Sequence, residues 1–169
     1  AALDLGTNNC RLLVVETRES GFEVVDSFSR IVRLGEGLAA SGRLSERAMA
    51  RTLAARKICA RIIARHRTDR IRCVATEACR RAANGPDFID RVARVIGIEL
   101  EILGQEEEAR LAMLGCMPLV EADSEQLLMV DIGGGSTEVM WLDRFAADAG
   151  GAPGHSISLP LGVVTLSES

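Results

Sequence analysis

The feature that most constrains this chain is a run of three glycines, residues 133–135, set between two apolar segments. Residues 127–130 precede it and residues 139–142 follow it, and this pattern predicts two strands joined by a tight turn. Because glycine has no Cβ, a ligand can come close to the N–H groups of such a turn. Successive N–H groups form a concave site for anions. The segment therefore predicts a hairpin that binds phosphate.

Polar side chains beside the glycines extend this prediction. Asp131 and Glu138 are suited to hold a divalent cation or to position a water molecule, and Ser136 and Thr137 add hydroxyl donors. Residues 4–9, with the sequence Asp-Leu-Gly-Thr-Asn-Asn, repeat the theme more weakly at the start of the chain. A short turn of that kind is more often only a hairpin, whereas a triple-glycine turn between two acidic residues favours a binding site.

Length and composition bound the class of protein. The 169 residues are 47% hydrophobic, which suits one soluble domain with its own core. The net charge of −4 gives no broad attraction for nucleic acid or for an anionic membrane, so we expect neither as a partner. The five cysteines form no Cys-x-x-Cys pair and are expected to be buried thiols in a reducing compartment, with the cytoplasm as the default location. The chain begins without Met and stops at Ser169, which indicates a fragment.

Hydrophobic periodicity alternates between strand and helix patterns along the chain. Three strands come first and helices separate the later ones, so we expect a mixed sheet that begins as an antiparallel meander and continues through parallel crossovers. In the first helix, with Ser45 as its N-cap, Arg56 interrupts an apolar face and should reach the surface or find a partner. The predicted strands are 1–6, 11–16, 22–34, 71–75, 98–103, a hairpin over 127–142 and 156–159, the predicted helices are 45–66, 87–96 and 105–117, and a loop is predicted over 145–153.

Several polar segments stand at predicted strand ends or tight turns. Ligands of open α/β sheets gather at the carboxyl ends of strands, so these segments can converge on one site. Each also has a simpler interpretation: the three glutamates 106–108 are usually a solvated helix start that complements the helix dipole, and Arg80 and Arg81 are usually surface charges. Their joint occurrence favours a site. The segments are 6–9, 76–80, 105–108 and 133–137.

These segments resemble the motifs of the exopolyphosphatase / guanosine pentaphosphate phosphohydrolase (Ppx/GppA) family. The similarity covers nearly the whole chain in collinear order, and five motifs in order are much more specific than any one of them. The motifs are two phosphate loops at 4–9 with Arg11 and at 131–138, a Thr-x-Ala-x-Arg segment at 75–80, a Glu-Glu-Ala-Arg-Leu helix at 106–111 and a strand with its turn at 158–162.

The resemblance implies an α/β fold, a ribonuclease H-like domain of the actin-like ATPase superfamily with a mixed five-stranded sheet flanked by helices. Residues 1–169 would form the first of two such domains that face each other across a cleft, so the opposite wall of the cleft would lie outside this chain. The resemblance also implies hydrolysis, with Mg²⁺, of terminal phosphate groups of inorganic polyphosphate or guanosine pentaphosphate, and a homodimer in the full-length protein.

By the same resemblance, Glu108 corresponds to the base that activates water, Glu138 to a second acidic group of the site and Asp131 to a metal-binding carboxylate. Anhydride hydrolysis needs an aligned water and neutralised charge on the phosphoryl group, which a carboxylate, backbone N–H groups, an arginine and Mg²⁺ supply together. Residues 104–105 are Gly-Gln where the family often has Ser-Gly. The implied phosphate contacts are Gly6, Thr7, Asn8, Asn9, Arg11, Arg80, Gly133, Gly134, Gly135, Ser136 and Thr137.

Two other functions stay open at this point. One is an actin-like ATPase or kinase half, because the same loops bind ATP there, although Arg80 and the Glu-Ala-Arg-Leu segment argue against it. The other is a non-catalytic sensor of polyphosphate or of a guanosine alarmone, against which an intact Glu108 and Asp131 argue. The sequence leaves open the choice between polyphosphate and guanosine pentaphosphate, and the oligomeric state.

Overall fold

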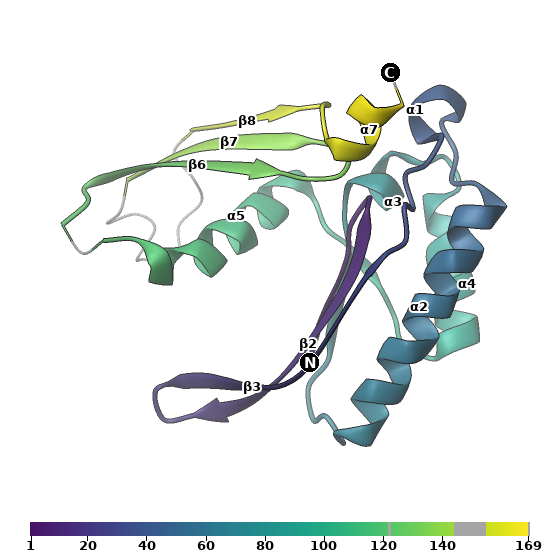
Figure 1. Cartoon of the computed structure of the whole chain (residues 1–169), viewed down its shortest axis with the longest axis horizontal. Helices are drawn as coiled ribbons and strands as arrows, with labels where there is room; N and C mark the ends of the chain where they lie inside the picture. The colour runs from purple at the N-terminus through teal and green to yellow at the C-terminus, as the bar shows by residue number, and fades with distance from the viewer. Residues whose placement is uncertain (122, 144–154, 169) are drawn as a thin grey trace.

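The computed structural model describes residues 1–121, 123–143 and 155–168 of the chain (Figure 1). These residues form two β-sheets, one of five strands and one of three, with helices packed against them. The predicted α/β class with a mixed five-stranded sheet is confirmed. The first sheet consists of β1 (Ala2–Leu5), β2 (Asn9–Arg18), β3 (Gly21–Ile31), β4 (Arg72–Ala75) and β5 (Glu101–Ile102), in the spatial order β3-β2-β1-β4-β5.

Strand pairing in this sheet places the ends of two strands side by side. β1 pairs antiparallel with β2 and parallel with β4, so the carboxyl ends of β1 and β4 lie at the same edge, with Leu5 opposite Ala75. The N–H of Thr76 donates to the carbonyl of Leu5 at 3.2 Å and ties the two ends together. Residues 6–9 and 76–80 therefore leave the sheet next to each other, in agreement with the expectation that these segments converge.

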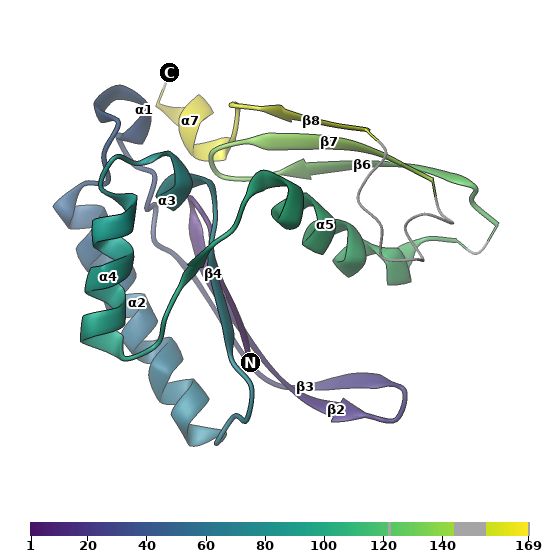
Figure 2. The same cartoon turned by 180° about the vertical axis from the view of Figure 1, so that it is seen from behind.

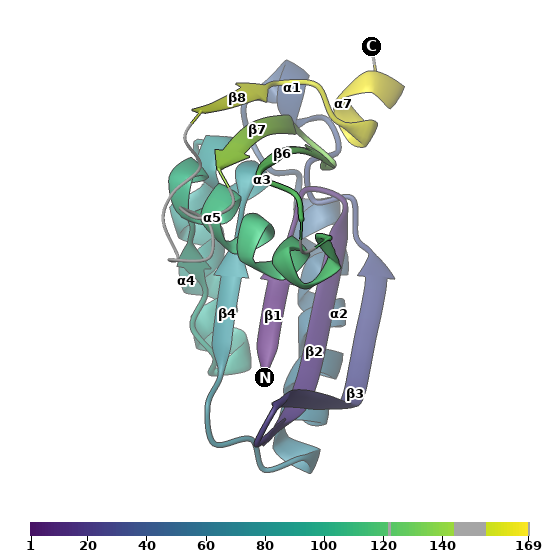
Figure 3. The same cartoon turned by 90° about the vertical axis from the view of Figure 1, so that its left-hand side faces the viewer.

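Helices α2 (Glu46–Arg65) and α4 (Gly85–Ile96) cover one face of the first sheet, as Figure 3 shows. Ser45 caps α2, as predicted, because its hydroxyl accepts a 3.2 Å hydrogen bond from the N–H of Ala48. The apolar faces of both helices pack on alternating side chains of β1 and β2. The main core formed in this way includes Leu3, Leu5, Leu12, Val14, Leu53, Ile63, Phe88 and Val92.

Arg56 of α2 is buried in this core instead of reaching the surface, and only 1% of it is exposed. Its terminal nitrogens donate to Sγ of Cys73 at 3.6 Å and to the carbonyl of Ile98 at 3.5 Å. Its Nε has no partner among the described residues. Of the two outcomes expected for Arg56, partners are observed. The strand predicted over 98–103 is shorter than expected, because only Glu101–Ile102 pair with β4.

The second sheet is a separate antiparallel meander of β6 (Gln126–Ile132), β7 (Thr137–Asp143) and β8 (His155–Leu159). Helix α5 (Gln105–Cys116) packs on one face of it (Figure 2). Ala109, Met113 and Met140 are buried together at this contact. The sequence predicts these strands, but it does not predict that they form a sheet of their own. Apolar runs identify strands without identifying the strands they pair with.

Short elements complete the described part of the chain: α1 (Leu38–Ser41), α3 (Glu77–Arg81), the 3₁₀ helix η1 (Met117–Leu119) and α7 (Val163–Ser167). α3 begins two residues after β4, and α7 follows β8 through the predicted turn at 160–162. No helix in the described residues is both long and apolar enough to cross a membrane. The loop predicted over 145–153 lies outside the described residues.

Candidate active site

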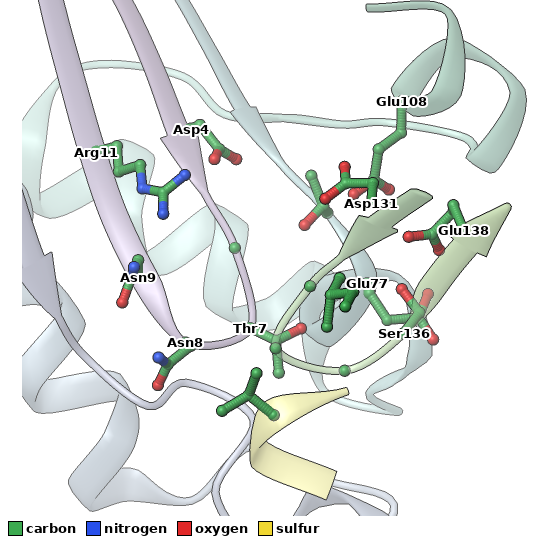
Figure 4. A pocket seen from close by; sticks show the side chains of 17 residues that line it. Asp4, Thr7, Asn8, Asn9, Arg11, Glu77, Glu108, Asp131, Ser136 and Glu138 are labelled. Atoms are coloured by element: carbon green, nitrogen blue, oxygen red, sulfur yellow. The ribbon is translucent and has the colours of Figure 1, made fainter. Parts of the chain in front are cut away.

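A cavity of about 300 Å³ opens between the two sheets (Figure 4). The β1–β2 loop and the start of α3 form one side of it, and the β6–β7 turn with the start of α7 forms the other. The β1–β2 loop thus lies opposite the glycine turn within this chain, and a second domain that closes the cleft stays a prediction. The lining residues are Asp4, Gly6, Thr7, Asn8, Asn9, Arg11, Thr76, Glu77, Glu108, Asp131, Ile132, Gly133, Gly134, Gly135, Ser136, Glu138 and Val163.

The carbonyl groups of the first loop are bonded away from the cavity. The carbonyl of Asn8 accepts from the N–H groups of Val32 and Arg33 at 2.8 and 2.9 Å. The carbonyl of Thr7 accepts from the N–H of Gly35 at 3.0 Å. No described residue accepts a hydrogen bond from the N–H groups of Thr7 and Asn8. The loop therefore presents donors to the cavity while its acceptors are occupied behind it.

The glycine turn follows the same arrangement. At the start of α7, the N–H groups of Val163 and Val164 donate to the carbonyls of Gly133 and Gly134 at 3.0 and 2.8 Å. From Gly134 to Ser136, the N–H groups have no acceptor within the described parts of the chain. Two loops from different sheets thus line one cavity with N–H groups that have no acceptor among the described residues, as an anion-binding nest requires.

The glycines of the turn also allow the two loops to touch. A Cβ added to Gly134 would lie 2.8 Å from the backbone nitrogen of Asn8, and one added to Gly135 would lie 2.9 Å from Oγ1 of Thr7. A Cβ on Gly162 would lie 2.5 Å from the carbonyl carbon of Gly134. From the sequence, the approach of a ligand was the expected reason for the glycines. The structure adds a second reason, which is close packing of backbone on backbone.

Carboxylates from four elements face the cavity. Asp131 and Glu138 are directly opposite each other on β6 and β7, so both lie on the same face of the second sheet. Asp4 on β1 and Glu108 on α5 approach the same space, as Figure 4 shows. Burial raises the pKa of Asp4; Arg11, its cross-strand neighbour, opposes the rise, and the charge of Asp131 adds to it.

Glu107 and Glu108 are adjacent in sequence but have opposite environments. Glu107 pairs with Arg110 at 2.7 Å and with Arg72 at 3.2 Å, and these arginines, Arg110 foremost, lower its pKa to about 2. Glu108 lines the cavity, and burial raises its pKa against the opposing effect of Arg80. A solvated helix start therefore does not describe Glu108, which is partly buried at the cavity.

The oxygen ligands of the cavity suit Mg²⁺ that is bound partly by the protein and partly by water and substrate, rather than Mg²⁺ enclosed by protein side chains alone. No three or more His, Cys, Asp or Glu side chains in the described residues are arranged as a cage for a metal ion. Mg²⁺ in phosphate-transfer sites is instead held by one or two carboxylates, with water and substrate phosphates completing the octahedron. Asp131, with Asp4 or Glu138 near it, offers such a partial set next to the N–H donors.

Two of the predicted phosphate contacts do not line the cavity. Arg80 donates from Nη1 to Glu108 at 2.9 Å and to the carbonyl of Leu103 at 2.7 Å. Thr137 donates from its hydroxyl to the carbonyl of Leu161 at 2.6 Å. Phosphate contacts by Arg80 and Thr137 stay predictions. The structure brings all the other predicted site residues together around the cavity.

Several cavity-lining residues had no individual role predicted: among them, Asp4 and Glu77 lie inside the candidate segments 4–9 and 76–80, and Val163 lies outside all of them. Asp4 had a signal, because Asp-Leu-Gly at 4–6 has the same pattern as Asp-Ile-Gly at 131–133. Glu77 also had one, since it follows the end of a predicted buried strand. Val163 had none, because its position depends on the path of the turn before α7.

Comparison with known proteins gives a consistent result. The model of a family described as the Ppx/GppA phosphatase family matches residues 13–169. Exopolyphosphatase 2 of Mycobacterium tuberculosis is 36% identical over 149 residues, covering 83% of this chain and 47% of that protein. The chain thus spans about half the length of the curated relatives it matches.

Solved structures agree with this comparison. A crystal structure of the Aquifex aeolicus member of the Ppx/GppA protein family matches with a TM-score of 0.78 and 32% identity, over 99% of this chain and 53% of that one. The ethanolamine utilization protein EutJ from Carboxydothermus hydrogenoformans matches with a TM-score of 0.57 and 19% identity, over 99% of this chain and 53% of that one, and this likeness shows the fold alone. The fold is of the actin-like ATPase type.

Proposed function

Because the chain belongs to the Ppx/GppA phosphatase family, we propose that the intact protein hydrolyses the terminal phosphoanhydride bond of inorganic polyphosphate. The observation that carries this proposal is that two loops with N–H groups unpartnered among the described residues line one cavity together with Glu108. Guanosine pentaphosphate is the alternative substrate, because its 5′ end carries the same kind of anhydride.

The two loops would bind the terminal phosphate group. Their N–H groups are directional donors, and Thr7 and Ser136, residues that are each only 5% exposed, add hydroxyl groups. Hydrogen bonds made at such shielded positions are stronger than those made in water. Arg11 places a positive charge at the same cavity. Together these groups would orient the phosphorus atom and stabilise the charge that develops on its oxygens.

A cation is needed for a polyanion to bind here, because acidic side chains outnumber basic ones in the lining. Asp131, with Asp4 or Glu138 beside it, would hold Mg²⁺. When bound, Mg²⁺ would neutralise negative charge on the phosphates. Carboxylates repel an anionic substrate unless a cation or an arginine neutralises their charge. The carboxylates of this cavity would therefore have to belong to the cation site or pair with arginine.

Glu108 would accept a proton from the attacking water. The water oxygen forms a bond to the terminal phosphorus as the bond from that phosphorus to the bridging oxygen breaks, which releases orthophosphate and a chain shorter by one phosphate. A raised pKa makes the carboxylate of Glu108 a better proton acceptor than a solvated one. Arg80, 2.9 Å from Glu108, fixes the direction in which this carboxylate points.

An assay of phosphate release tests this proposal. The intact protein would be incubated with inorganic polyphosphate or with guanosine pentaphosphate, each with Mg²⁺ or with a chelator. We expect release from polyphosphate that depends on Mg²⁺. Tight binding of either compound without release would indicate a sensor instead, and phosphate transfer from ATP to an acceptor molecule would indicate a kinase.

A further inference from the structure

Glu77 is a buried carboxylate of the cavity that the proposed reaction does not use. It is the first residue of α3, and only 10% of its side chain is exposed. One carboxylate oxygen accepts a 2.6 Å hydrogen bond from Nη2 of Arg80, and the other lies 3.6 Å from Nη1 of Arg81. The negative charge of Glu77 is therefore compensated by arginines of its own helix.

Arg80 connects Glu77 to Glu108. While Nη2 of Arg80 donates to Glu77, Nη1 donates to Glu108 at 2.9 Å and to the carbonyl of Leu103 at 2.7 Å. A guanidinium group is planar, so fixing both terminal nitrogens fixes the plane and the position of the whole group. The carboxylate of Glu108 then receives its hydrogen bond from a donor that cannot rotate freely.

The second loop holds Glu77 from the other side. A Cβ added to Gly135 would lie 3.2 Å from Cγ of Glu77, so the glycine turn packs directly on this side chain. Glu77 thus stands between the phosphate-binding turn and the arginine that contacts Glu108. This arrangement links the position of the bound phosphate to the position of the proton acceptor.

We infer that Glu77 is a positioning residue: its carboxylate holds the guanidinium of Arg80 against Glu108 and so aims Glu108 at the attacking water. This inference rests on the proposed hydrolase function. Without Glu77, Arg80 would keep Glu108 as its only carboxylate partner among the described residues, and its guanidinium would be free to rotate about that contact. Glu77 itself does not bind phosphate, because a carboxylate repels the anion.

The test is the Glu77→Gln substitution in the intact protein, assayed with polyphosphate and Mg²⁺. We expect kcat to fall about tenfold to a hundredfold, the scale of a catalytic group displaced by about 1 Å. KM should stay within about twofold, because the phosphate contacts are unchanged. The Glu46→Gln substitution, which breaks a 2.8 Å ion pair with Arg91 on the surface, is the matched control and should leave both constants unchanged.

A double substitution separates positioning from a general structural effect. If Glu77 acts only through Arg80, then adding Glu77→Gln to an Arg80→Gln variant should change kcat by less than about twofold. Should Glu77→Gln not fold, Glu77→Asp keeps the charge but withdraws the carboxylate, and its kcat should also fall with KM unchanged. Wild-type kcat in a folded variant, a rise in KM alone, or additive losses in the double variant would overturn the inference. If the wild-type protein releases no phosphate, the proposed function fails, whichever way Glu77 acts.

Discussion

The guanidinium of Arg80 and the carboxylate of Glu108 form a 2.9 Å ion pair that joins α3 to the first turn of α5. This pair connects the carboxyl end of β4 in the first sheet to the helix that packs on the second sheet. Burial raises the pKa of Glu108 and Arg80 opposes that rise, so the pair sets how readily this carboxylate takes a proton.

Glu108→Gln should separate activity from stability. Loss of the proposed proton acceptor should lower kcat by about 100-fold to 10,000-fold. The pKa of Glu108 is higher in the folded protein than in the unfolded chain. The protonated form therefore stabilises the fold fully at pH values below the ordinary pKa of glutamate, and this stabilisation is lost as the pH rises through the folded-state pKa. At pH 7 the charge of Glu108 therefore lowers the stability of the fold, and an uncharged glutamine should keep or raise the melting temperature. Thermal unfolding and phosphate release at pH 7 check this, and a lower melting temperature with normal release would contradict it.

Glu107→Gln should lower stability and leave activity unchanged, the opposite of Glu108→Gln. The pKa of Glu107 is lowered to about 2, chiefly by Arg110. The ionised form therefore stabilises the fold fully at pH values above the ordinary pKa of glutamate, and this stabilisation is lost as the pH falls through about 2. The substitution should lower the urea midpoint at pH 7 and lower it less at pH 3, without changing kcat. Glu106→Gln, at the exposed preceding position, is the control and should shift neither midpoint. An equal shift at both pH values would rule out the ion pairs as the cause.

Gly134→Ala should damage both stability and phosphate binding. The new Cβ would lie 2.8 Å from the nitrogen of Asn8 and 3.0 Å from Cβ of Thr7, so the two loops must move apart. Forced packing of this kind costs about 1–3 kcal/mol in the free energy of unfolding. Gly115→Ala, in the exposed part of α5 with nothing within 4 Å, should instead stabilise the protein by about 0.4–1 kcal/mol. Urea unfolding and the KM for polyphosphate measure the contrast, and equal effects would contradict the loop contact.

Asp131→Asn tests the proposed cation site. Losing this carboxylate should raise the Mg²⁺ concentration for half-maximal phosphate release by at least about tenfold, or about 1.4 kcal/mol of binding free energy. Asp90→Asn, at an exposed position of α4, should leave the Mg²⁺ titration unchanged. If the two variants titrate alike, Asp131 does not hold the cation.

Much of the fold follows from local patterns in the sequence. Ser45 caps α2 where predicted, and the parallel pairing of β1 with β4 brings the segments after Leu5 and Ala75 together because strand order determines which ends share an edge. The approach of the glycine turn to residues 4–9 also follows the resemblance between the two loops. These features depend on the spacing of residue types, which one sequence displays directly.

Other features depend on contacts between distant residues, which spacing does not display. The separate second sheet follows from the pairing of β6 only with β7 among the described strands. The partners of Arg80 could not be predicted, because an arginine after a strand can reach the solvent, a ligand or a carboxylate from another helix. Arg56 is buried, and its only hydrogen-bond partners in the described structure are Cys73 and Ile98. A pattern that places a charged residue on an apolar face does not predict these partners.

Oxygen-18 water provides the most direct test of the central claim that this cavity activates water against a terminal phosphate. The intact protein would hydrolyse inorganic polyphosphate with Mg²⁺ in labelled water, and the released phosphate would be analysed by mass spectrometry. We predict one labelled oxygen in each phosphate released, at a rate that Glu108→Gln lowers by at least about 100-fold. Release of unlabelled phosphate, or labelled release at the wild-type rate from Glu108→Gln, would contradict the account.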